Sequence, residues 1–328
     1  MSGRKLLLAL FGGIAVASAV LLALPFRAPP SDKVTISAGQ IKSALIYVAI
    51  DKGYFADEGI DVTLVSRPTG KQSLAMVNDG TADVAAVAVY PVMATVLEGR
   101  PVKIFATIMD SYKELAVVAR KDAGITSPKD LIGKSLAFLP GTNTEVFTHI
   151  FLEYHGIPAS QVTLVPVAPE EAVRAVLDGK VSALSTLVDI RIALQKALAD
   201  RAVVFMEEGI YTDLWTLAAK SDFVTRRPET VARLLRALLK AERFLAQYPD
   251  ETIAIVARQL NLSPDSIAAL WDIYNFGVKL DQTLVVNLES EARWKMRGQG
   301  VAKTPNFLDT ISLDGLLSVE QSRVTVAR

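Results

Sequence analysis

Two stretches of this sequence, residues 34–89 and 134–186, repeat one pattern of strands and helices. Each stretch predicts a strand, a helix, a second strand, a second helix and a third strand. A glycine follows each predicted helix, where helices commonly end: Gly53, Gly80, Gly156 and Gly179. A duplicated unit of this kind predicts two similar lobes with a cleft between them. A protein that clamps a ligand is therefore the leading interpretation.

The remaining segments predict how the two lobes are joined. Apolar runs at 114–120 and 214–219 predict strands on which the chain crosses to the second lobe and returns. We therefore expect an α/β fold in which each lobe is a doubly wound mixed sheet. The first lobe covers 31–117 and the second covers 118–213, while 214–328 returns to the first lobe and adds the C-terminal helices.

The N-terminus predicts an export signal. Arg4 and Lys5 precede an uninterrupted apolar or small run, Leu6 to Leu24, and Ala17-Ser18-Ala19 provides a cleavage site typical of a signal peptide. The run is also about 28 Å long as a helix, which nearly spans a bilayer core. We expect residues 1–30 to be either a cleaved signal peptide or a retained membrane anchor with a linker, and the rest of the chain to be exported.

The composition argues against several classes of protein. The chain has 35 Lys and Arg against 35 Asp and Glu, and it has no basic stripe with interleaved aromatic residues, so a nucleic-acid partner is not expected. The absence of cysteine excludes disulfides, thiolate metal sites and a cysteine nucleophile. The two histidines stand outside any acidic or histidine cluster, and nucleophile-elbow and phosphate-loop motifs are missing. We expect no enzyme activity, no metal and no cofactor.

Five loops follow the carboxyl ends of predicted strands, where doubly wound sheets bind ligands. Helix N-termini in such loops present N–H groups and partial positive charge to a ligand. We expect most of these loops to face the cleft. They are residues 39–43, 69–71, 89–91, 140–145 and 187–191.

The loop at 140–145, Pro-Gly-Thr-Asn-Thr-Glu, has two interpretations. In the first, Gly141, Thr142 and Thr144 form a cradle for an oxyanion such as a sulfonate, a carboxylate or nitrate. In the second, the loop is a capping box with Thr142 at the N-cap and Glu145 three residues later. The charge of Glu145 opposes binding of a bare anion unless this side chain folds back onto the cap.

Polar side chains of the first two loops are further candidates. Gln40 has no structural role that the sequence indicates, so we interpret it as a ligand contact. Ser43 is expected to be an N-cap whatever else it does. Lys42 and Lys71 either balance the charge of a ligand or are solvated.

Two tyrosines and one acid complete the set. Tyr90 and Tyr211 are either core residues or a wall for the ligand. Asp189 either stabilises a helix N-terminus or reaches into the cleft. The full predicted ligand-binding set is Gln40, Lys42, Ser43, Thr69, Tyr90, Gly141, Thr142, Thr144, Asp189 and Tyr211.

Several of these motifs occur together in one known family. Residues 49–55 (AIDKGYF) and 58–62 (EGIDV) resemble the signature of the periplasmic binding proteins of ABC importers for nitrate, sulfonates, taurine and thiamine-precursor pyrimidines. The resemblance covers about residues 34–300. Further segments that resemble the family are NDGTAD at 78, LIGKS at 131, PGT at 140, LDGKVSA at 177 and PETV at 228.

The resemblance implies a type II two-lobed periplasmic-binding-protein fold in which the loops 40–43 and 141–144 contact the ligand. The chain departs from the family at Val188-Asp189-Ile190, where many relatives have an aromatic residue, an acid and a proline. This departure bears on the identity of the ligand. Related pyrimidine-synthase enzymes carry a cysteine-rich motif, which a chain without cysteine cannot have.

These observations predict the solute-binding component of an ABC importer. We expect a monomer that closes on a small organic anion or zwitterion, sulfonate-like in character, and delivers it to a permease in the membrane. A zwitterion tolerates Glu145 and Asp189 better than nitrate does. Two alternatives remain, namely a membrane-anchored ligand sensor that uses the same clamp and a pyrimidine-precursor-binding protein.

Overall fold

Uninterrupted apolar runs form the central strands of two sheets in the computed structural model of the protein, which describes residues 32–297 and 305–327. The predicted signal or anchor segment, residues 1–30, lies outside the described residues. β3 (Val84–Ala88) is buried along its whole length, as expected of a parallel strand covered on both faces. None of the described helices combines the length and the apolar character of a membrane span.

The larger sheet has six strands in the order β11-β4-β10-β3-β1-β2. β1, β2 and β3 are parallel, as the repeated unit predicts, whereas β10 and β11 pair antiparallel with their neighbours. The strands other than β3 are β1 (Asp32–Ala38), β2 (Ile60–Ser66), β4 (Val102–Ser111), β10 (Asp213–Lys220) and β11 (Asn275–Lys279).

The smaller sheet has five strands in the order β7-β6-β8-β5-β9. Its parallel strands repeat the order of β2, β1 and β3, and β5 and β9 add antiparallel pairings. The two copies predicted from the sequence therefore have the same topology. The strands are β5 (Ala116–Arg120), β6 (Ser135–Phe138), β7 (Thr163–Pro166), β8 (Ala183–Thr186) and β9 (Ala202–Phe205).

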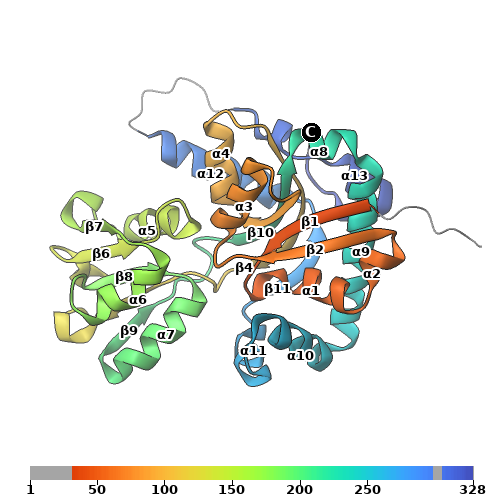
Figure 1. The fold of residues 1–328 in the computed structure, drawn as a ribbon. Coiled ribbons are helices and arrows are strands. Elements are labelled where there is room, and N and C mark those ends of the chain that lie inside the picture. Colours follow the sequence, from red (N-terminus) through yellow and green to blue (C-terminus); the bar gives the residue numbers. More distant parts are fainter. Residues whose placement is uncertain (1–31, 298–304, 328) are drawn as a thin grey trace, which may run out of the picture. The chain divides into compact units, whose positions relative to one another are not determined.

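The repeated helices follow the strands as predicted, and each of the four glycines after them has a positive φ. Figure 1 shows the smaller sheet with α5, α6 and α7 around it. The helices of the two copies, together with the helix that follows each copy (α4 and α7), are α1 (Ala44–Asp51), α2 (Tyr54–Asp57), α3 (Gly70–Asp79), α4 (Val89–Leu97), α5 (Asn143–Tyr154), α6 (Pro169–Leu177) and α7 (Val188–Leu198). Pro91 is the third residue of α4, although proline most often occupies the first position of a helix.

The C-terminal part of the chain is mostly helical and packs on the larger sheet. The amphipathic α9 contacts α1 and β11, and α12 contacts α4. These helices are α8 (Ser221–Arg226), α9 (Pro228–Gln247), α10 (Pro249–Leu260), α11 (Pro264–Trp271), α12 (Gln282–Met296) and α13 (Asp314–Val319).

The chain passes between the two sheets twice, through residues 112–115 and 206–212. Each passage is followed directly by a strand that pairs antiparallel with the last parallel strand of the sheet it enters, β5 with β8 and β10 with β3. We call the larger sheet with its helices lobe 1 and the smaller sheet with its helices lobe 2. Each lobe has its own apolar core. Val146 of α5 and Val188 of α7 pack with the core of lobe 1, so the two lobes are in contact.

Candidate functional site

Residues of all five predicted loops line one small pocket between the lobes. Its volume is about 10 Å³, which is room for about one water molecule. The lobes are therefore closed around it. Lobe 1 contributes Gln40, Lys42, Thr69, Gly70, Lys71, Ala88, Pro91 and Trp215, and lobe 2 contributes Thr142, Asn143 and Leu187. We call this space the inner pocket.

The N-termini of four helices meet at the inner pocket, two from each lobe. The N-cap residues are Thr69 for α3, Ala88 for α4, Thr142 for α5 and Leu187 for α7, and all four line the pocket. The side chains of Thr69 and Thr142 accept hydrogen bonds from N–H groups of their own helices. Ala88 and Leu187 have no side chain that can do so. The N–H groups and positive potential of α4 and α7 are thus directed at the pocket without a cap from the chain.

Lys42 is the central cation of the site and has two carboxylate partners. Its Nζ lies 3.1 Å from Asp213 Oδ2 and 3.2 Å from Glu114 Oε1, and all three side chains are buried. Burial opposes the charged form of Lys42, but the attraction of Asp213 and Glu114 outweighs it and raises the pKa. Burial also opposes the charged form of Glu114 and raises its pKa, and the attraction of Lys42 offsets part of this increase. Lys42 is therefore charged, but two acids already balance it.

A second set of contacts joins this cation to lobe 2 and to an aromatic wall. Asn143 Nδ2 donates a hydrogen bond of 2.7 Å to Asp213 Oδ1, which connects the two lobes. Lys42 Nζ lies 4.3 Å from the centre of the Trp215 ring. Trp215 Nε1 donates to Ser43 Oγ, and Ser43 Oγ donates to Gly39 O. Ser43 is the N-cap of α1 as predicted, but its hydroxyl bonds these partners instead of capping the helix.

Gln40 has an unusual backbone conformation. Its φ of 63° and ψ of 161° place it in a region that is otherwise almost confined to glycine. Its carbonyl accepts hydrogen bonds from Tyr47 Oη and Ser43 N, which hold this conformation. Strain of this kind persists only where the surrounding structure imposes it, and ligand clamps are a common place for it. The strain marks Gln40 as a candidate contact independently of its side chain.

The loop at 140–145 caps a helix and also borders the inner pocket, and its role as an oxyanion cradle stays a prediction. Thr142 is the N-cap of α5, but Glu145 reaches Gly141 N and not the backbone of Thr142, so the predicted capping box is replaced by a longer loop contact. Thr144 Oγ1 accepts a hydrogen bond from Leu139 N behind the loop. Glu145 has folded back onto the loop. Of the predicted cradle residues, Thr142 lines the inner pocket, whereas Gly141 and Thr144 support the loop.

The remaining predicted residues do not line the inner pocket. Tyr90 Oη donates to Glu145 Oε1 of lobe 2 at 2.8 Å, and Tyr211 Oη donates to Glu291 Oε1 of α12 at 2.7 Å. Asp189 is exposed and lines a neighbouring pocket together with Gln40. Direct contact of these side chains with a solute stays a prediction.

The sequence-based set omitted several residues of the site. Glu114 lies in one crossing segment and Asp213 directly follows the other. Both are far from Lys42 in the chain, so no local pattern pointed to them. Trp215 is in the returning strand β10, where Trp215 pairs with Ala88 at the end of β3. A Cβ at Gly70 would come within 2.7 Å of the Trp215 ring, so the glycine at the start of α3 admits this side chain. In the sequence, Gly70 was the one feature that indicated a large side chain such as Trp215 next to this loop.

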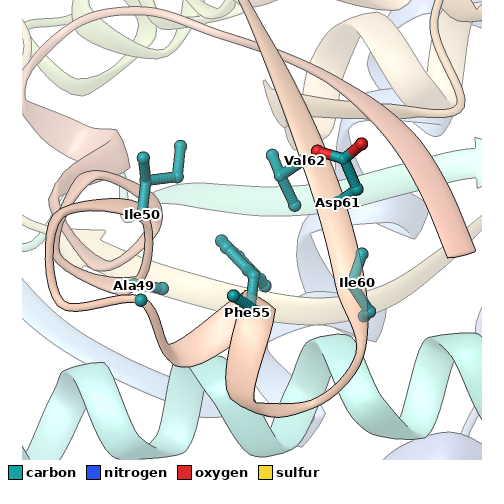
Figure 2. A pocket seen from close by; sticks show the side chains of 8 residues that line it. Ala49, Ile50, Phe55, Ile60, Asp61 and Val62 are labelled. Atoms are coloured by element: carbon teal, nitrogen blue, oxygen red, sulfur yellow. The ribbon is translucent and has the colours of Figure 1, made fainter. Parts of the chain in front are cut away.

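A second pocket, of about 330 Å³, lies on lobe 1 alone (Figure 2). All of its lining comes from residues 49–62, in α1, α2 and β2, and Asp61 is its ionisable side chain. No residue of lobe 2 reaches it, so it is not part of the cleft. Within the described residues, no group of three or more His, Asp or Glu side chains is arranged to hold a metal ion.

Comparison with known proteins adds sequence and fold relationships. The profile of the family described as NMT1/THI5 like matches residues 40–252. The chain is 27% identical over 226 residues, 67% of each chain, to a putative aliphatic sulfonates-binding protein of Bacillus subtilis. It is 27% identical over 139 residues to a protein of Uromyces fabae named 4-amino-5-hydroxymethyl-2-methylpyrimidine phosphate synthase, a match that spans 42% of this chain and 40% of the synthase.

A solved structure shares the fold. The periplasmic aliphatic sulphonate binding protein SsuA from Escherichia coli superposes with a TM-score of 0.73 at 17% identity. The match covers 87% of this chain and 92% of that protein. At this identity the likeness concerns the fold, which is the two-lobed fold of periplasmic binding proteins.

Proposed function

The chain belongs to the NMT1/THI5-like family, and we propose that it is the solute-binding component of an ABC importer. In this proposal the two lobes close on a small organic anion or zwitterion with an oxyanion head, such as a sulfonate. The solute leaves chemically unchanged and passes to a permease.

The convergence of four helix N-termini on the inner pocket carries this proposal. Two of these helices, α4 and α7, come from different lobes and have N-caps without a polar side chain. An oxyanion placed between them satisfies N–H groups of both lobes at once. Because each lobe supplies part of the coordination, binding favours the closed state over the open one.

The charges around the pocket favour a particular kind of head group. Lys42 is already balanced by Asp213 and Glu114, so the free positive potential comes from the helix ends and from Lys71. Lys71 Nζ donates one hydrogen bond, to Pro140 O of lobe 2, and has two further N–H groups. A singly charged oxyanion fits this potential, and a zwitterion also fits because acids stand close by.

Hydrogen bonds are among the contacts that hold the lobes together in the closed arrangement. Asn143 donates to Asp213, Lys71 donates to Pro140 O and Tyr90 donates to Glu145. The inner pocket of about 10 Å³ is too small for a sulfonate group, so the lobes must separate for a solute to enter. The proposed cycle is therefore opening, entry and closure around the solute.

Location and partners follow from the same proposal. The basic N-terminus with its apolar run supports export, and the structural neighbour is named as periplasmic. Whether residues 1–30 are cleaved or retained separates a free binding protein from an anchored sensor, and the mass of the mature protein decides it. In either case we propose one copy that presents its closed lobes to a membrane partner.

A pyrimidine precursor is the second candidate solute. Trp215 lines the inner pocket and offers an aromatic wall on which a heteroaromatic ring can stack. The relative from Uromyces fabae is named as a pyrimidine phosphate synthase. Related pyrimidine-synthase enzymes carry a cysteine-rich motif, whereas this chain has no cysteine. We therefore propose binding of such a compound and not its synthesis.

A ligand panel with one matched pair of variants tests the proposal. Sulfonates, carboxylates, nitrate, pyrimidines and amines are screened by thermal shift, and hits are measured by calorimetry. Lys71→Gln removes a charged donor at the inner pocket and should weaken binding of an oxyanion by about tenfold or more.

Lys180→Gln is the matched control, because Lys180 is an exposed lysine in the turn before β8, at the opposite end of the strands. It should leave affinity unchanged. A panel without any hit, or equal affinity of Lys71→Gln and the parent protein, contradicts the proposed function.

A further inference from the structure

A buried acid lies in the first crossing segment, residues 112–115. The side chain of Glu114 is 2% exposed, although the chain here passes from one lobe to the other. Lobe 1 reaches it through Lys42, whose Nζ lies 3.2 Å from Glu114 Oε1. Lobe 2 holds the same segment through α7, because Arg191 Nη1 donates a hydrogen bond of 3.1 Å to Lys113 O. Groups of both lobes therefore surround Glu114.

The acids that contact Lys42 outnumber the bases. In the part of the chain that the structure describes, Glu114 and Asp213 form ion pairs with Lys42 and with no other cation. Fully ionised, these three buried side chains carry one negative charge in excess. An uncompensated buried charge is costly, and a buried acid then takes up a proton instead.

The hydrogen bonds indicate which acid holds this proton. Asp213 has a partner on each oxygen, Lys42 at Oδ2 and Asn143 at Oδ1. Glu114 Oε2 is buried and has no hydrogen-bond partner among the described residues, and the same is true of the nearby Tyr274 hydroxyl. A proton on Glu114 Oε2 removes a charge that no donor stabilises, and the Tyr274 oxygen is able to accept it in a hydrogen bond.

The charged groups of lobe 2 do not alter this assignment. Asp189 and Arg191 both lie in the first turn of α7 and interact with Glu114, with opposite signs. Their effects on the charge of Glu114 therefore oppose each other.

The balance of these effects favours the neutral carboxyl. Burial raises the pKa of Glu114, and Asp213 and Asp189 raise it further. Lys42 and the Tyr274 hydroxyl lower it in part, but the net direction is upward. Burial also raises the pKa of Tyr274, so this hydroxyl stays neutral.

Opening of the lobes would bring water to Glu114. Lys42 and Tyr274 belong to lobe 1, whereas Asn143 and Asp189 belong to lobe 2, and the crossing segment lies between them. A hydrated carboxyl returns to its ordinary pKa of 4.5. The open state therefore releases a proton that the closed state holds.

We propose that closure of the lobes takes up a proton from water at Glu114, so that the affinity for the solute falls as pH rises. The inference rests on the proposed function for the movement of the lobes. Because the pKa is raised in the closed state, the added stability of this state is complete below the ordinary pKa. It is lost as pH rises through the pKa of the closed state.

His149 titrates at another contact between the lobes and acts with the opposite sign. Burial lowers its pKa, and its ring lies 4.8 Å from that of Trp294 in lobe 1. Protonation of His149 at low pH therefore favours opening. This effect is common to the parent protein and to variants of Glu114, so the difference between them reports on Glu114.

Energy transfer between one dye in each lobe measures the ratio of open to closed molecules without solute. The chain has no cysteine, so Ala75→Cys in lobe 1 and Ser160→Cys in lobe 2, both at exposed positions, provide the attachment sites. All proteins also carry Tyr90→Phe, which removes a hydrogen bond to Glu145 between the lobes and keeps the open state populated. We call the protein with these three changes the reference protein.

Glu114→Gln replaces the carboxyl by a neutral group of similar shape. From about pH 5 to about pH 8, the ratio of open to closed molecules should rise about tenfold or more in the reference protein relative to Glu114→Gln. Glu208→Gln is the matched control, because Glu208 is an exposed acid of the second crossing segment and pairs with Lys113. It should respond to pH as the reference protein does.

An equal response of Glu114→Gln and the reference protein overturns the inference, since Glu114 then holds the same charge in both states. A more open Glu114→Gln at about pH 8 also overturns it, because the ionised carboxyl would then favour closure. Glu114→Met is a second neutral variant should glutamine disturb the fold. Failure of both variants to fold would show that the folded protein needs the charge, against a neutral Glu114.

The proposed function is tested separately by the ligand panel. If no solute binds and energy transfer shows one state at every pH, the function fails and the proton uptake with it. If a sulfonate binds and closes the lobes while Glu114→Gln and the reference protein respond equally to pH, the function stands and only the proton uptake is wrong.

Discussion

Glu291 is a buried carboxyl whose protonation is coupled to folding. It lies in α12, is 1% exposed, and accepts a hydrogen bond from Tyr211 Oη in the segment that returns to lobe 1. Its second oxygen has no hydrogen-bond partner among the residues that the structure describes. Burial raises the pKa of Glu291 from 4.5 to about 8, and the hydrogen bond from Tyr211 offsets only part of this. Near neutral pH the folded protein therefore keeps a proton on Glu291 that the unfolded chain has released.

Glu291→Gln should change how stability depends on pH. Between about pH 4.5 and about pH 8, the folded state binds one more proton at Glu291 than the unfolded state does, so the free energy of unfolding falls as pH rises. Glutamine does not titrate and keeps an acceptor for Tyr211. Chemical denaturation at about pH 5 and about pH 8 should show the variant gaining roughly 4 kcal/mol relative to the parent protein across this window.

The exposed Glu289 of the same helix is the control for this measurement. Glu289→Gln removes a surface pair with Arg293 and should shift stability little at either pH. Parallel pH profiles of the Glu291→Gln variant and the parent protein would show that Glu291 is ionised in the folded state, against this prediction.

Helix N-termini are the elements that give the site its character. α4 and α6 both begin after an alanine N-cap, Ala88 and Ala168, without a side-chain cap. Ala88 lines the inner pocket, whereas Ala168 is exposed and lies outside it. The two helices therefore allow the structural and the ligand-binding effects of a missing cap to be separated.

Ala88→Ser should stabilise the protein and weaken solute binding. A serine hydroxyl at this N-cap can accept a hydrogen bond from the first turn of α4, which is worth about 1 kcal/mol. The same hydroxyl competes with the solute for that N–H. Denaturation should report the gain in stability, and calorimetry with the best oxyanion from the panel should report the loss of affinity.

Ala168→Ser provides the comparison. It should raise stability by a similar amount through α6 and leave affinity unchanged. Equal affinity of both serine variants would show that the N-terminus of α4 takes no part in binding.

At the scale of the whole molecule, contacts between α5 of lobe 2 and lobe 1 favour closure. Tyr90 Oη, which accepts a hydrogen bond from Lys295 Nζ of the same lobe, donates to Glu145, and the rings of His149 and Trp294 lie 4.8 Å apart. Val146 adds an apolar contact to the core of lobe 1. These contacts do not need a solute, so they stabilise the closed arrangement of the empty protein as well.

Tyr90→Phe should shift the protein towards the open state. It removes a hydrogen bond to a carboxylate, worth about 1.5–3 kcal/mol, without changing the shape of a buried ring. The closed population relative to the open one should fall by about tenfold or more. Small-angle scattering without solute should then give a larger radius of gyration, which returns to the parent value when solute is added.

Tyr154→Phe is the control variant, which tests whether removal of another tyrosine hydroxyl has the same effect. Tyr154 is 61% exposed at the end of α5, and its variant should scatter like the parent protein. If Tyr90→Phe also scatters like the parent, the contact between Tyr90 and Glu145 does not control closure.

The sequence by itself determined the elements, the duplicated topology and the gathering of the loops. Apolar runs of strand length, helical periodicity and the glycines after the helices are local signals, because they depend on backbone preferences and on which faces are buried. The carboxyl ends of parallel strands lie at one edge of a sheet. For that reason the order of the strands along the chain is enough to predict that the five loops lie together.

The tertiary structure alone decided which side chains in those loops are free and which are already paired. Lys42 looked like a cation available to a ligand, but Asp213, 171 residues away, and Glu114 balance it. Such pairings depend on which strands and helices become neighbours, and distant segments are brought together only by packing of the cores, so no local pattern in the sequence records them.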